Sequence, residues 1–509
     1  MSDVVFLHGL NNDPLVWERT AAALLPRLTA RALDLPAQSD LDSLAEHVAD
    51  QLTPGTLLVG HSFGGAVAMA VADRFPELLS GLVLVNAPHD TDSAEQAEQR
   101  RARAAAVTPE NYESVAMGRL DLIYTPERAE DEGVIAERQR SVRAYGAERY
   151  RAHSTALSHR PDRSNFLSET ELPVCVIAAE HDGVIPTADQ RHWAEQGGAT
   201  YVEIADTAHM LPAEEPQLLA DAINEWWRVT EAGRGYVPAS LPAGPLPDYE
   251  VHGSGETTLF LLHGAYGDRG YFDDAISRWT RAGLRVVAWT CPGYAPTDEV
   301  PQGYGVPLLA EYAARMVLRE RTTRNVLLGH SMGALIGPRV PALVGNALDG
   351  LILSAGSPGF VNRSAADKEK YLAERVKPIT EDGLSVAEYA VGLLHTMMAP
   401  GASGPLVDRV IEVVTAMKTE SFVASMRAIT EYNSVPSLQS LQIPTLMLAG
   451  EHDPACTPTG MQRMHDLAPG SEYHEIRGAG HYAFAERPEE YHDLTTKFIA
   501  KVDSPVMTP

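Results

Sequence analysis

Short, continuously apolar runs alternate with amphipathic segments along the whole chain. Residues 4–7 and 57–59 are apolar at every position, which is typical of strands buried on both faces of a sheet. Between such runs, segments such as residues 66–71 repeat apolar positions at helical spacing. Strands that alternate with helices in this way predict βαβ units, and therefore an α/β fold with a mostly parallel, doubly wound sheet.

The pattern occurs twice in the sequence. Residues 4–9 (VVFLHG) match residues 259–264 (LFLLHG), and residues 60–64 (GHSFG) match residues 329–333 (GHSMG). Three further pairs of segments match in the same order: 81–88 with 350–358, 172–182 with 443–453, and 205–210 with 477–482. We interpret the chain as one domain present in two tandem copies, because matched segments in a fixed order are the signature of an internal repeat.

The repeat defines a domain organisation. We expect domains at residues 1–230 and 248–500, a Pro- and Gly-rich linker at residues 231–247, and a tail at residues 501–509. Proline cannot continue a helix or a central strand, so the linker is either an extended, semi-rigid spacer or an ordered strap that packs across the domains.

Each copy contains one long stretch without strand patterns. Residues 89–171 and 359–442 carry helical periodicity, and we expect each stretch to form a helical cap over the site of its domain. The second copy has extra residues before its first match, and we expect 249–252 and 257–262 to form an added hairpin at the sheet edge. The first sheet is then expected to be shorter on that side.

A serine stands at the end of one strand in each copy. Ser62 and Ser331 each occupy the centre of a Gly-x-Ser-x-Gly motif between a buried strand and a helix. Glycine is favoured two residues before and two after such a serine because the turn is very tight. The helix that follows points its amide groups at any oxyanion that forms there, so the position suits a nucleophile.

Candidates for the base and the acid follow in the same order in both copies. Asp182 and Asp453 each come directly after a buried strand. His209 and His481 follow 27 and 28 residues later, after one more strand. The carboxyl ends of parallel strands form one edge of the sheet, where ligands bind in such folds, so these side chains are expected to meet the serines there.

These motifs and their Ser…Asp…His order make both copies similar to members of the α/β-hydrolase superfamily. The resemblance covers nearly all of each half. It implies two catalytic triads, Ser62–Asp182–His209 and Ser331–Asp453–His481. It also implies oxyanion holes made of backbone amides, which belong to Leu10 and Phe63 in the first domain and to Ala265 and Met332 in the second.

The resulting prediction is a tandem serine hydrolase that cleaves ester, lactone or thioester bonds of small to medium molecules through an acyl-enzyme in each domain. One alternative is a cofactor-free lyase, C–C hydrolase, acyltransferase or cyclase that uses the same triad. Another is that one copy is catalytic and the other serves binding or scaffolding. Apolar cap residues either line the pockets or form the cap cores: Tyr112, Met117 and Tyr124 in the first copy, and Met397, Met398, Phe422 and Met426 in the second.

Composition narrows the partners. The 41 basic and 68 acidic side chains give a formal charge of −27, which argues against nucleic acid or an anionic membrane as a partner. No run reaches the roughly 18 apolar residues of a membrane span. The three cysteines form neither a disulfide framework nor a zinc motif, and no metal or cofactor motif is present. The first strand begins too early for a signal peptide to precede it, so we expect a cytoplasmic protein. Its oligomeric state is left open.

Overall fold

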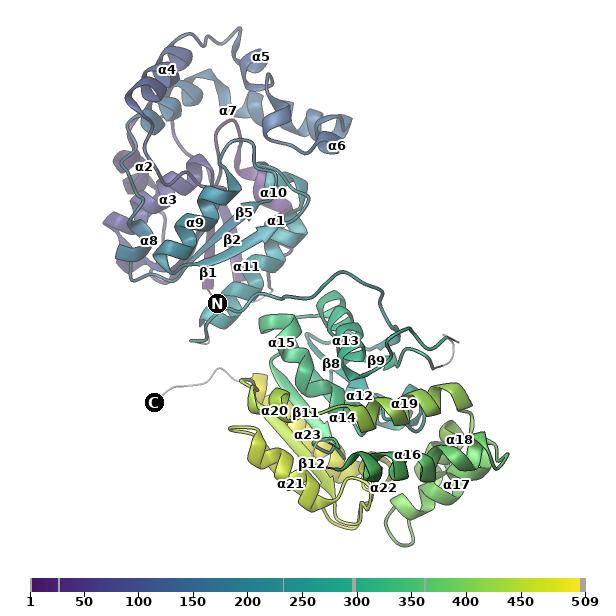
Figure 1. The fold of residues 1–509 in the computed structure, drawn as a ribbon. Coiled ribbons are helices and arrows are strands. Elements are labelled where there is room, and N and C mark those ends of the chain that lie inside the picture. Colours follow the sequence, from purple (N-terminus) through teal and green to yellow (C-terminus); the bar gives the residue numbers. More distant parts are fainter. Residues whose placement is uncertain (1, 26–27, 232, 295–298, 361–362, 504–509) are drawn as a thin grey trace. The chain divides into compact units, whose positions relative to one another are not determined.

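A computed structural model describes residues 2–25, 28–231, 233–294, 299–360 and 363–503. Contacts divide the chain into two compact units, Met1–Tyr236 and Val237–Pro509, which we call the first and second unit and describe one at a time (Figure 1). Residues 504–509 of the expected tail lie outside the described residues.

The first unit is built on a parallel sheet. Over the described residues it is six-stranded, in the order β2-β1-β3-β4-β5-β6. Its strands are β1 (Ser2–Leu7), β2 (Leu28–Leu33), β3 (Thr56–His61), β4 (Leu79–Val85), β5 (Val174–Ala179) and β6 (Thr200–Ile204). Every neighbouring pair is parallel, so all strands end at the same edge. This is the α/β architecture that the sequence predicts.

Helices cover both faces of this sheet. They are α1 (Glu18–Ala22), α2 (Leu41–Ala49), α3 (Phe63–Arg74), α9 (Thr187–Gly197), α10 (Leu211–Glu214) and α11 (Pro216–Glu231). Side chains of β1 alternate between two cores, with Val5 and Leu7 packed among α2 and α3, and Val4 and Phe6 packed among α11. This alternation explains why the strands are apolar at every position.

The stretch between β4 and β5 is helical. It contains α4 (Ala94–Ala105), α5 (Tyr112–Ala116), α6 (Pro126–Ala129), α7 (Glu132–Ser158) and α8 (Phe166–Glu169). Figure 1 shows α4, α5 and α6 gathered at one end of the unit, opposite α11. The long helix α7 changes direction at Gly146, whose φ of 80° is outside the helical range.

The second unit repeats this sheet with one more strand. Over the described residues its order is β13-β12-β11-β10-β8-β9-β7. The strands are β7 (Asp248–His252), β8 (Thr257–Leu262), β9 (Arg285–Thr290), β10 (Arg324–His330), β11 (Gly350–Ser354), β12 (Thr445–Gly450) and β13 (Glu472–Ile476). The predicted hairpin is wrong. Strand β7 lies antiparallel to β9, because β8 already has β9 and β10 on its two edges.

The helices of the second unit follow the same plan. Those around the sheet are α12 (Asp273–Arg281), α13 (Val306–Glu320), α14 (Met332–Ile336), α15 (Val340–Val344), α21 (Pro458–Leu467), α22 (Ala483–Glu486) and α23 (Pro488–Asp503). The cap contains α16 (Ala365–Thr380), α17 (Val386–Met397), α18 (Pro405–Thr415), α19 (Thr419–Glu431) and α20 (Val435–Gln439). Within the described ranges, no helix combines the length and apolar character that a membrane crossing requires.

The proline-rich segment at the start of the second unit is ordered. The Ser240 amide donates to the carbonyl of Leu343 at 3.2 Å, and the Asn346 amide donates to the carbonyl of Val237 at 3.0 Å. The Arg315 guanidinium donates to the carbonyls of Pro242 and Pro245. Within the second unit this segment is therefore a strap held by main-chain hydrogen bonds.

Candidate active sites

Both predicted nucleophiles stand in a strained turn. Ser62 joins β3 to α3 with φ 52° and ψ −117°, and Ser331 joins β10 to α14 with φ 55° and ψ −113°. A side chain on Gly60 would collide with the carbonyl oxygen of Gly64, and one on Gly64 would collide with that of Leu7. The same collisions occur around Ser331, so sterics of the turn explain the glycines on each side of the serine.

The first unit brings its three predicted residues together. His209 Nε2 lies 3.0 Å from Ser62 Oγ, and His209 Nδ1 lies 2.9 Å and 3.0 Å from the two carboxylate oxygens of Asp182. Asp182 Oδ1 also accepts from the amides of Val184 and Ile185, which hold the carboxylate at the end of β5. These contacts form a continuous chain from carboxylate to hydroxyl.

Two buried side chains hold the main chain of His209. Its carbonyl accepts hydrogen bonds from His61 Nε2 at 2.8 Å and from Asn86 Nδ2 at 2.9 Å. Burial, together with the nearby charge of His209, lowers the pKa of His61 to about 3, so this ring is neutral. His61 therefore supports the site as a neutral donor. Asn86 was not singled out by the sequence pattern.

In the second unit the predicted acid and base are joined more tightly. His481 Nδ1 lies 2.7 Å from Asp453 Oδ2, while Asp453 Oδ1 accepts from the amides of Ala455 and Cys456. Burial raises the pKa of Asp453, but the charge and hydrogen bond of His481, with the two amides, outweigh it and keep that pKa below its usual value. Asp453 is therefore a carboxylate at neutral pH.

Among the described residues, the serine of the second unit, Ser331, makes no hydrogen bond with its histidine, His481. The Ser331 hydroxyl faces Gly264, where an added Cβ would lie 3.3 Å from Oγ. The Gly264 amide donates to the hydroxyl of Tyr271, and Val16 stands at the corresponding position of the first unit. The second unit thus brings together two of its three residues by hydrogen bonds and places the third beside them.

The amides implied as oxyanion donors are unoccupied by protein acceptors. Within the described residues, the backbone N–H groups of Leu10 and Phe63 donate to no acceptor, and the same holds for Ala265 and Met332. Phe63 and Met332 are the first residues of α3 and α14, where amides lack intrahelical partners. Two free donors therefore accompany each serine.

A glutamate missed in the sequence connects each cap to its histidine loop. The Glu214 carboxylate accepts from the amides of Thr125 and Ala208 at 2.7 Å. In the second unit, Glu486 accepts from the amide of Ala399 at 2.7 Å and from those of Gly480 and Tyr482, which flank His481. The two glutamates are separated by 272 residues, as His209 and His481 are, and this equal spacing is the signal that identifies them.

Two groups of side chains within the described residues have ligand atoms close enough to share a metal ion. One is Asp453, Cys456 and His481, and the other is the exposed group Glu180, His181 and Asp206. Each combines residues that are distant in sequence, which is why no motif marks them. Burial and the charge of Asp453 raise the pKa of the Cys456 thiol, so it stays protonated and is no rival nucleophile.

The apolar cap residues named from the sequence are mostly core. Tyr112 and Tyr124 are buried in clusters of the first unit, with Met117 packed against one of them. The four candidates of the second unit, Met397, Met398, Phe422 and Met426, are buried in its single large cluster.

Comparison with known proteins identifies the family of the chain. The sequence model of the alpha/beta hydrolase family matches residues 4–222 and 259–494, one match to each unit. The chain therefore belongs to the alpha/beta hydrolase family, and it carries that fold twice.

Individual relatives match about half of the chain or less. A 2-succinyl-6-hydroxy-2,4-cyclohexadiene-1-carboxylate synthase from Enterobacter sp. (strain 638) is 28% identical over 229 residues, covering 41% of this chain and 82% of that protein. A 3-oxoadipate enol-lactonase 2 from Acinetobacter baylyi is 27% identical over 186 residues, covering 36% and 67%. Among solved structures, a thermophilic esterase from Thermogutta terrifontis is 24% identical, covers 45% of this chain and 90% of its own, and has a TM-score of 0.42.

Proposed function

We propose that each unit is a serine hydrolase that acts on ester, lactone or thioester bonds of small molecules. The observation that carries the proposal is the chain of contacts in the first unit, where one histidine bonds a serine hydroxyl on one side and a buried carboxylate on the other. A serine hydroxyl needs a base to become nucleophilic and a third group to orient that base, and this arrangement supplies both.

The proposed reaction uses the residues in a fixed order. His209 Nε2 takes the hydroxyl proton as Ser62 Oγ attacks the substrate carbonyl, and Asp182 stabilises the imidazolium that forms. The amides of Leu10 and Phe63 donate to the tetrahedral oxyanion. His209 then gives the proton to the leaving group. A water molecule releases the acyl group from Ser62 by the reverse path.

The second unit performs the same steps once the Ser331 hydroxyl forms a hydrogen bond with His481. In serine side chains a change of χ1 between staggered wells is a small motion, so substrate binding beside Gly264 is enough to drive it. The ionised Asp453 and its short bond to His481 support the role of His481 as base. Ala265 and Met332 supply the two amides.

The second candidate is a lyase or C–C bond reaction on the same residues. The names of the relatives favour keeping it, because they include a synthase. Others are named as hydrolases of dienoic and dienedioic acids. The triad then acts as a base and an oxyanion site without an acyl-enzyme.

Active-site labelling tests the proposal directly. Wild type, Ser62→Ala, Ser331→Ala and the double variant are treated with a fluorophosphonate, and adducts are counted by intact mass. We expect two adducts on wild type, one on each single variant and none on the double variant. Wild type that takes up no adduct would overturn the proposal for both units.

Turnover of short-chain nitrophenyl esters by the same four proteins separates the two candidates. A serine hydrolase shows a burst of nitrophenol followed by steady turnover, and each serine variant loses the part that its unit contributes. Labelling without any ester turnover would favour the lyase or C–C reaction.

A further inference from the structure

An arginine of the first cap reaches the loop beside the first site. Arg138 lies on α7 and is only 5% exposed. Its Nη1 donates to the carbonyl of Asn11 at 2.9 Å and to the side-chain oxygen of Asn12 at 2.7 Å. These two residues directly follow Leu10, whose amide is a proposed oxyanion donor. The guanidinium therefore contacts the two residues that follow the proposed oxyanion donor.

The charge of Arg138 affects the pKa of His61, the residue before Ser62. Burial lowers the pKa of His61 to about 3, and the positive charge of Arg138 is among the smaller causes that lower it further. His61 precedes Ser62, and its ring centroid lies 5.1 Å from that of His209. Arg138 is thus within electrostatic range of the Ser62–His209 pair.

The other edge of the guanidinium has no acceptor. Among the described residues, Arg138 Nε is fully enclosed and makes no hydrogen bond, and Nη2 donates to none. With Nη1 occupied, the donors without an acceptor are Nε and Nη2, which lie on the same edge of the guanidinium. A carboxylate pairs with this edge through two parallel hydrogen bonds only when the side chains that enclose Nε move aside to admit it.

No carboxylate of the described residues forms an ion pair with Arg138, and its acidic neighbours are engaged elsewhere. Asp13 pairs with Arg140 at 2.7 Å. Glu137 pairs with Arg19 at 3.3 Å. The Glu214 carboxylate accepts hydrogen bonds from main-chain amides of the cap and of the histidine loop, as described above. The groups that face Arg138 are the phenols of Tyr112, Tyr124 and Tyr145, whose pKa values are raised by burial, so they are neutral.

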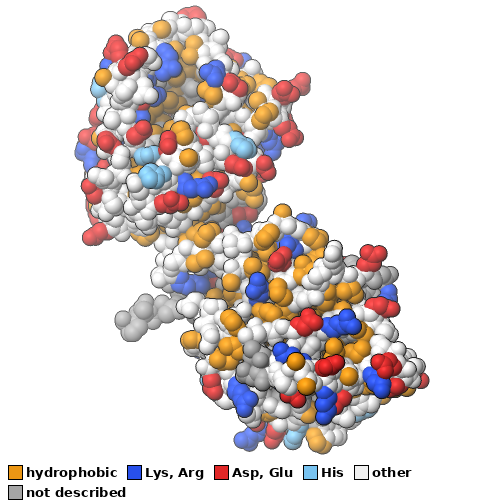
Figure 2. Space-filling view, in the orientation of Figure 1, with side chains coloured by type: hydrophobic (Ala, Val, Ile, Leu, Met, Phe, Trp, Pro, Cys, Tyr) orange, Lys and Arg blue, Asp and Glu red, His pale blue; other side chains and the backbone are white. Residues whose placement is uncertain are grey.

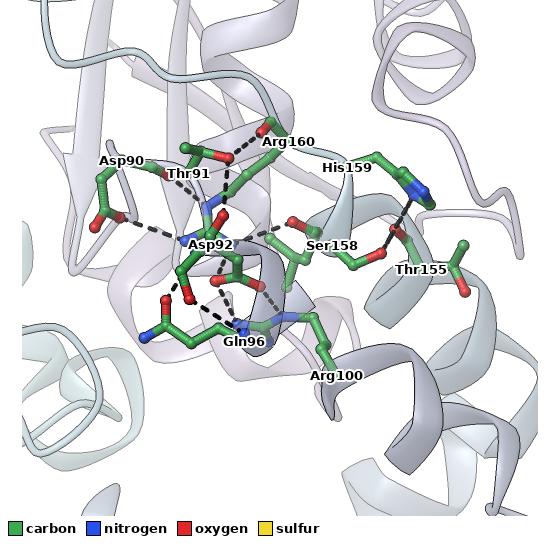
Figure 3. Close-up of polar contacts among 11 residues, drawn as sticks. Asp90, Thr91, Asp92, Gln96, Arg100, Thr155, Ser158, His159 and Arg160 are labelled. Carbon is green, nitrogen blue, oxygen red and sulfur yellow. Dashed lines mark hydrogen bonds and ion pairs between the residues drawn. The ribbon is translucent and has the colours of Figure 1, made fainter. Parts of the chain in front are cut away.

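A second buried arginine of the same cap, Arg160, has a carboxylate partner, as buried arginines usually do. Arg160 is 8% exposed, and it bonds the carboxylate of Asp92 at 2.8 Å and the carbonyl of Asp90 at 2.6 Å (Figure 3). Arg100 Nε donates to the other carboxylate oxygen of Asp92. On the surface, Arg143 pairs with Glu113, and Figure 2 shows Lys and Arg side chains interspersed with Asp and Glu over the visible face.

A buried charge without a partner is costly, and proteins keep one chiefly where a ligand supplies the partner. We propose that Arg138 binds a carboxylate of the substrate, so that the first unit acts on esters, lactones or thioesters that also carry a free carboxylate. This inference rests on the hydrolase function proposed above. The free edge of one guanidinium neutralises one negative charge and matches a planar carboxylate, whereas a phosphate dianion would need more positive charge than Arg138 provides.

Paired substrates test the proposal in a background where only the first unit turns over. The Ser331→Ala protein is assayed with 4-nitrophenyl butyrate and with the 4-nitrophenyl hemiesters of succinic, glutaric and adipic acids. We expect kcat/KM for the best hemiester to exceed that for the butyrate. We also expect one chain length to be preferred, because the distance from Ser62 to Arg138 is fixed by the fold.

Substitution of the arginine supplies the second measurement. In the same background, Arg138→Met is expected to lower the ratio of hemiester to butyrate kcat/KM by about tenfold to hundredfold, the range for loss of a charge-assisted pair. Arg138→Lys is expected to recover part of the ratio, since it keeps the charge and loses the fork. Arg143→Met, on the exposed face of the same helix, is the matched control and leaves the ratio unchanged.

The outcomes separate this inference from the hydrolase proposal. Each variant is first labelled at Ser62 with a fluorophosphonate, which reports a folded site independently of substrate charge. Failure of Ser62 to label in the Ser331→Ala protein overturns the proposed function. Normal labelling with no preference for hemiesters, or a ratio that Arg138→Met does not change, overturns the role of Arg138. Equal loss for both substrates would instead assign Arg138 a structural role in joining cap and loop.

Discussion

The two units use different side chains to hold the loop that follows the first strand and lies beside the serine. In the first unit the residues after Leu10 are held by the charged Arg138. In the second unit the carbonyl of Ala265 accepts from the hydroxyl of Tyr294 at 2.8 Å, and the amide of Gly267 donates to the thioether of Met417 at 2.8 Å. Burial raises the pKa of Tyr294, so this phenol is neutral.

The features that the two units share are those expected to carry out the reaction, and the features that differ are those expected to select the substrate. The serine turn, the aspartate bonded to its histidine and the amides that bond the aspartate are common to both units, and among the described residues only the serine–histidine bond is confined to the first. The cap residues that contact the loop beside the serine differ between the units. In the second unit the cap also brings a cation near this loop, since Arg375 of α16 interacts with the hydroxyl of Tyr266. The different groups that hold the loop lead us to expect two units that share a mechanism and differ in the substrates they accept.

The strongest test of the shared mechanism is removal of each base. We expect His209→Ala to slow fluorophosphonate labelling of Ser62 by about 10⁴-fold, and His481→Ala to slow that of Ser331 by a similar factor, since loss of a triad member removes activation of the serine. Labelling rates are read by mass spectrometry in the background of the other serine's alanine variant. An unchanged rate in His481→Ala would mean that Ser331 reacts without its histidine.

Glu214 and Glu486, which connect each cap to its histidine loop, are expected to contribute equally to the stability of the two units. Glu214→Gln and Glu486→Gln each weaken charge-assisted bonds to amides of the cap and the histidine loop, at a cost of about 3 kcal/mol in the free energy of unfolding of that unit. Denaturant unfolding followed by hydrogen exchange resolves the two units. Glu215→Gln is the control, because Glu215 is half-exposed and pairs only with Arg128 at 3.4 Å. If Glu214→Gln or Glu486→Gln lowers the free energy of unfolding no more than Glu215→Gln does, that glutamate is not needed for stability.

Acid sensitivity of the first unit has a specific source in His61. Its folded pKa of about 3 lies below the value of 6.5 for a free histidine, so below pH 6.5 the unfolded chain takes up a proton that the folded unit does not. Stability therefore falls as the pH drops from 6.5 toward 3, and we expect His61 to account for about 2 kcal/mol between pH 7 and pH 5.

Unfolding of His61→Gln at both pH values measures this contribution, with the exposed His192→Gln as the control. The glutamine keeps a donor for the carbonyl of His209 and cannot be protonated. A pH dependence of the first unit that is as steep in His61→Gln as in wild type would contradict the assignment.

The smallest effect is expected at Cys456. Ile185 stands at the corresponding position of the first unit, so Cys456→Ile gives the second unit the residue of the first. The thiol is protonated, and we expect kcat/KM of the second unit, measured in the Ser62→Ala background, to stay within about twofold. A large loss would show that the thiol takes part in the reaction.

Local sterics made part of the fold predictable. Ser62 and Ser331 could be identified because the turn excludes a side chain at the glycines around them. Part of this constraint acts within the motif, between Gly60 and Gly64, and part of it comes from the neighbouring strand, where Leu7 excludes a side chain on Gly64. The strands were predictable because burial on both faces requires apolar residues at every position. The hairpin before β8 was mispredicted, since neighbours in sequence pair only when an edge is free, and β9 and β10 occupy both edges of β8.

The sequence by itself determined the repeated fold, the two serine turns and the order of aspartate and histidine, because each of these depends on short-range geometry or on periodicity. Only the tertiary structure decided which hydroxyl bonds its histidine, that Glu214 joins the cap to the histidine loop, and that Arg138 has no carboxylate partner among the described residues. The environment of a buried charge is the sum of contacts from segments far apart in the chain. No local pattern records that sum, so the expected difference in substrates became visible only after folding.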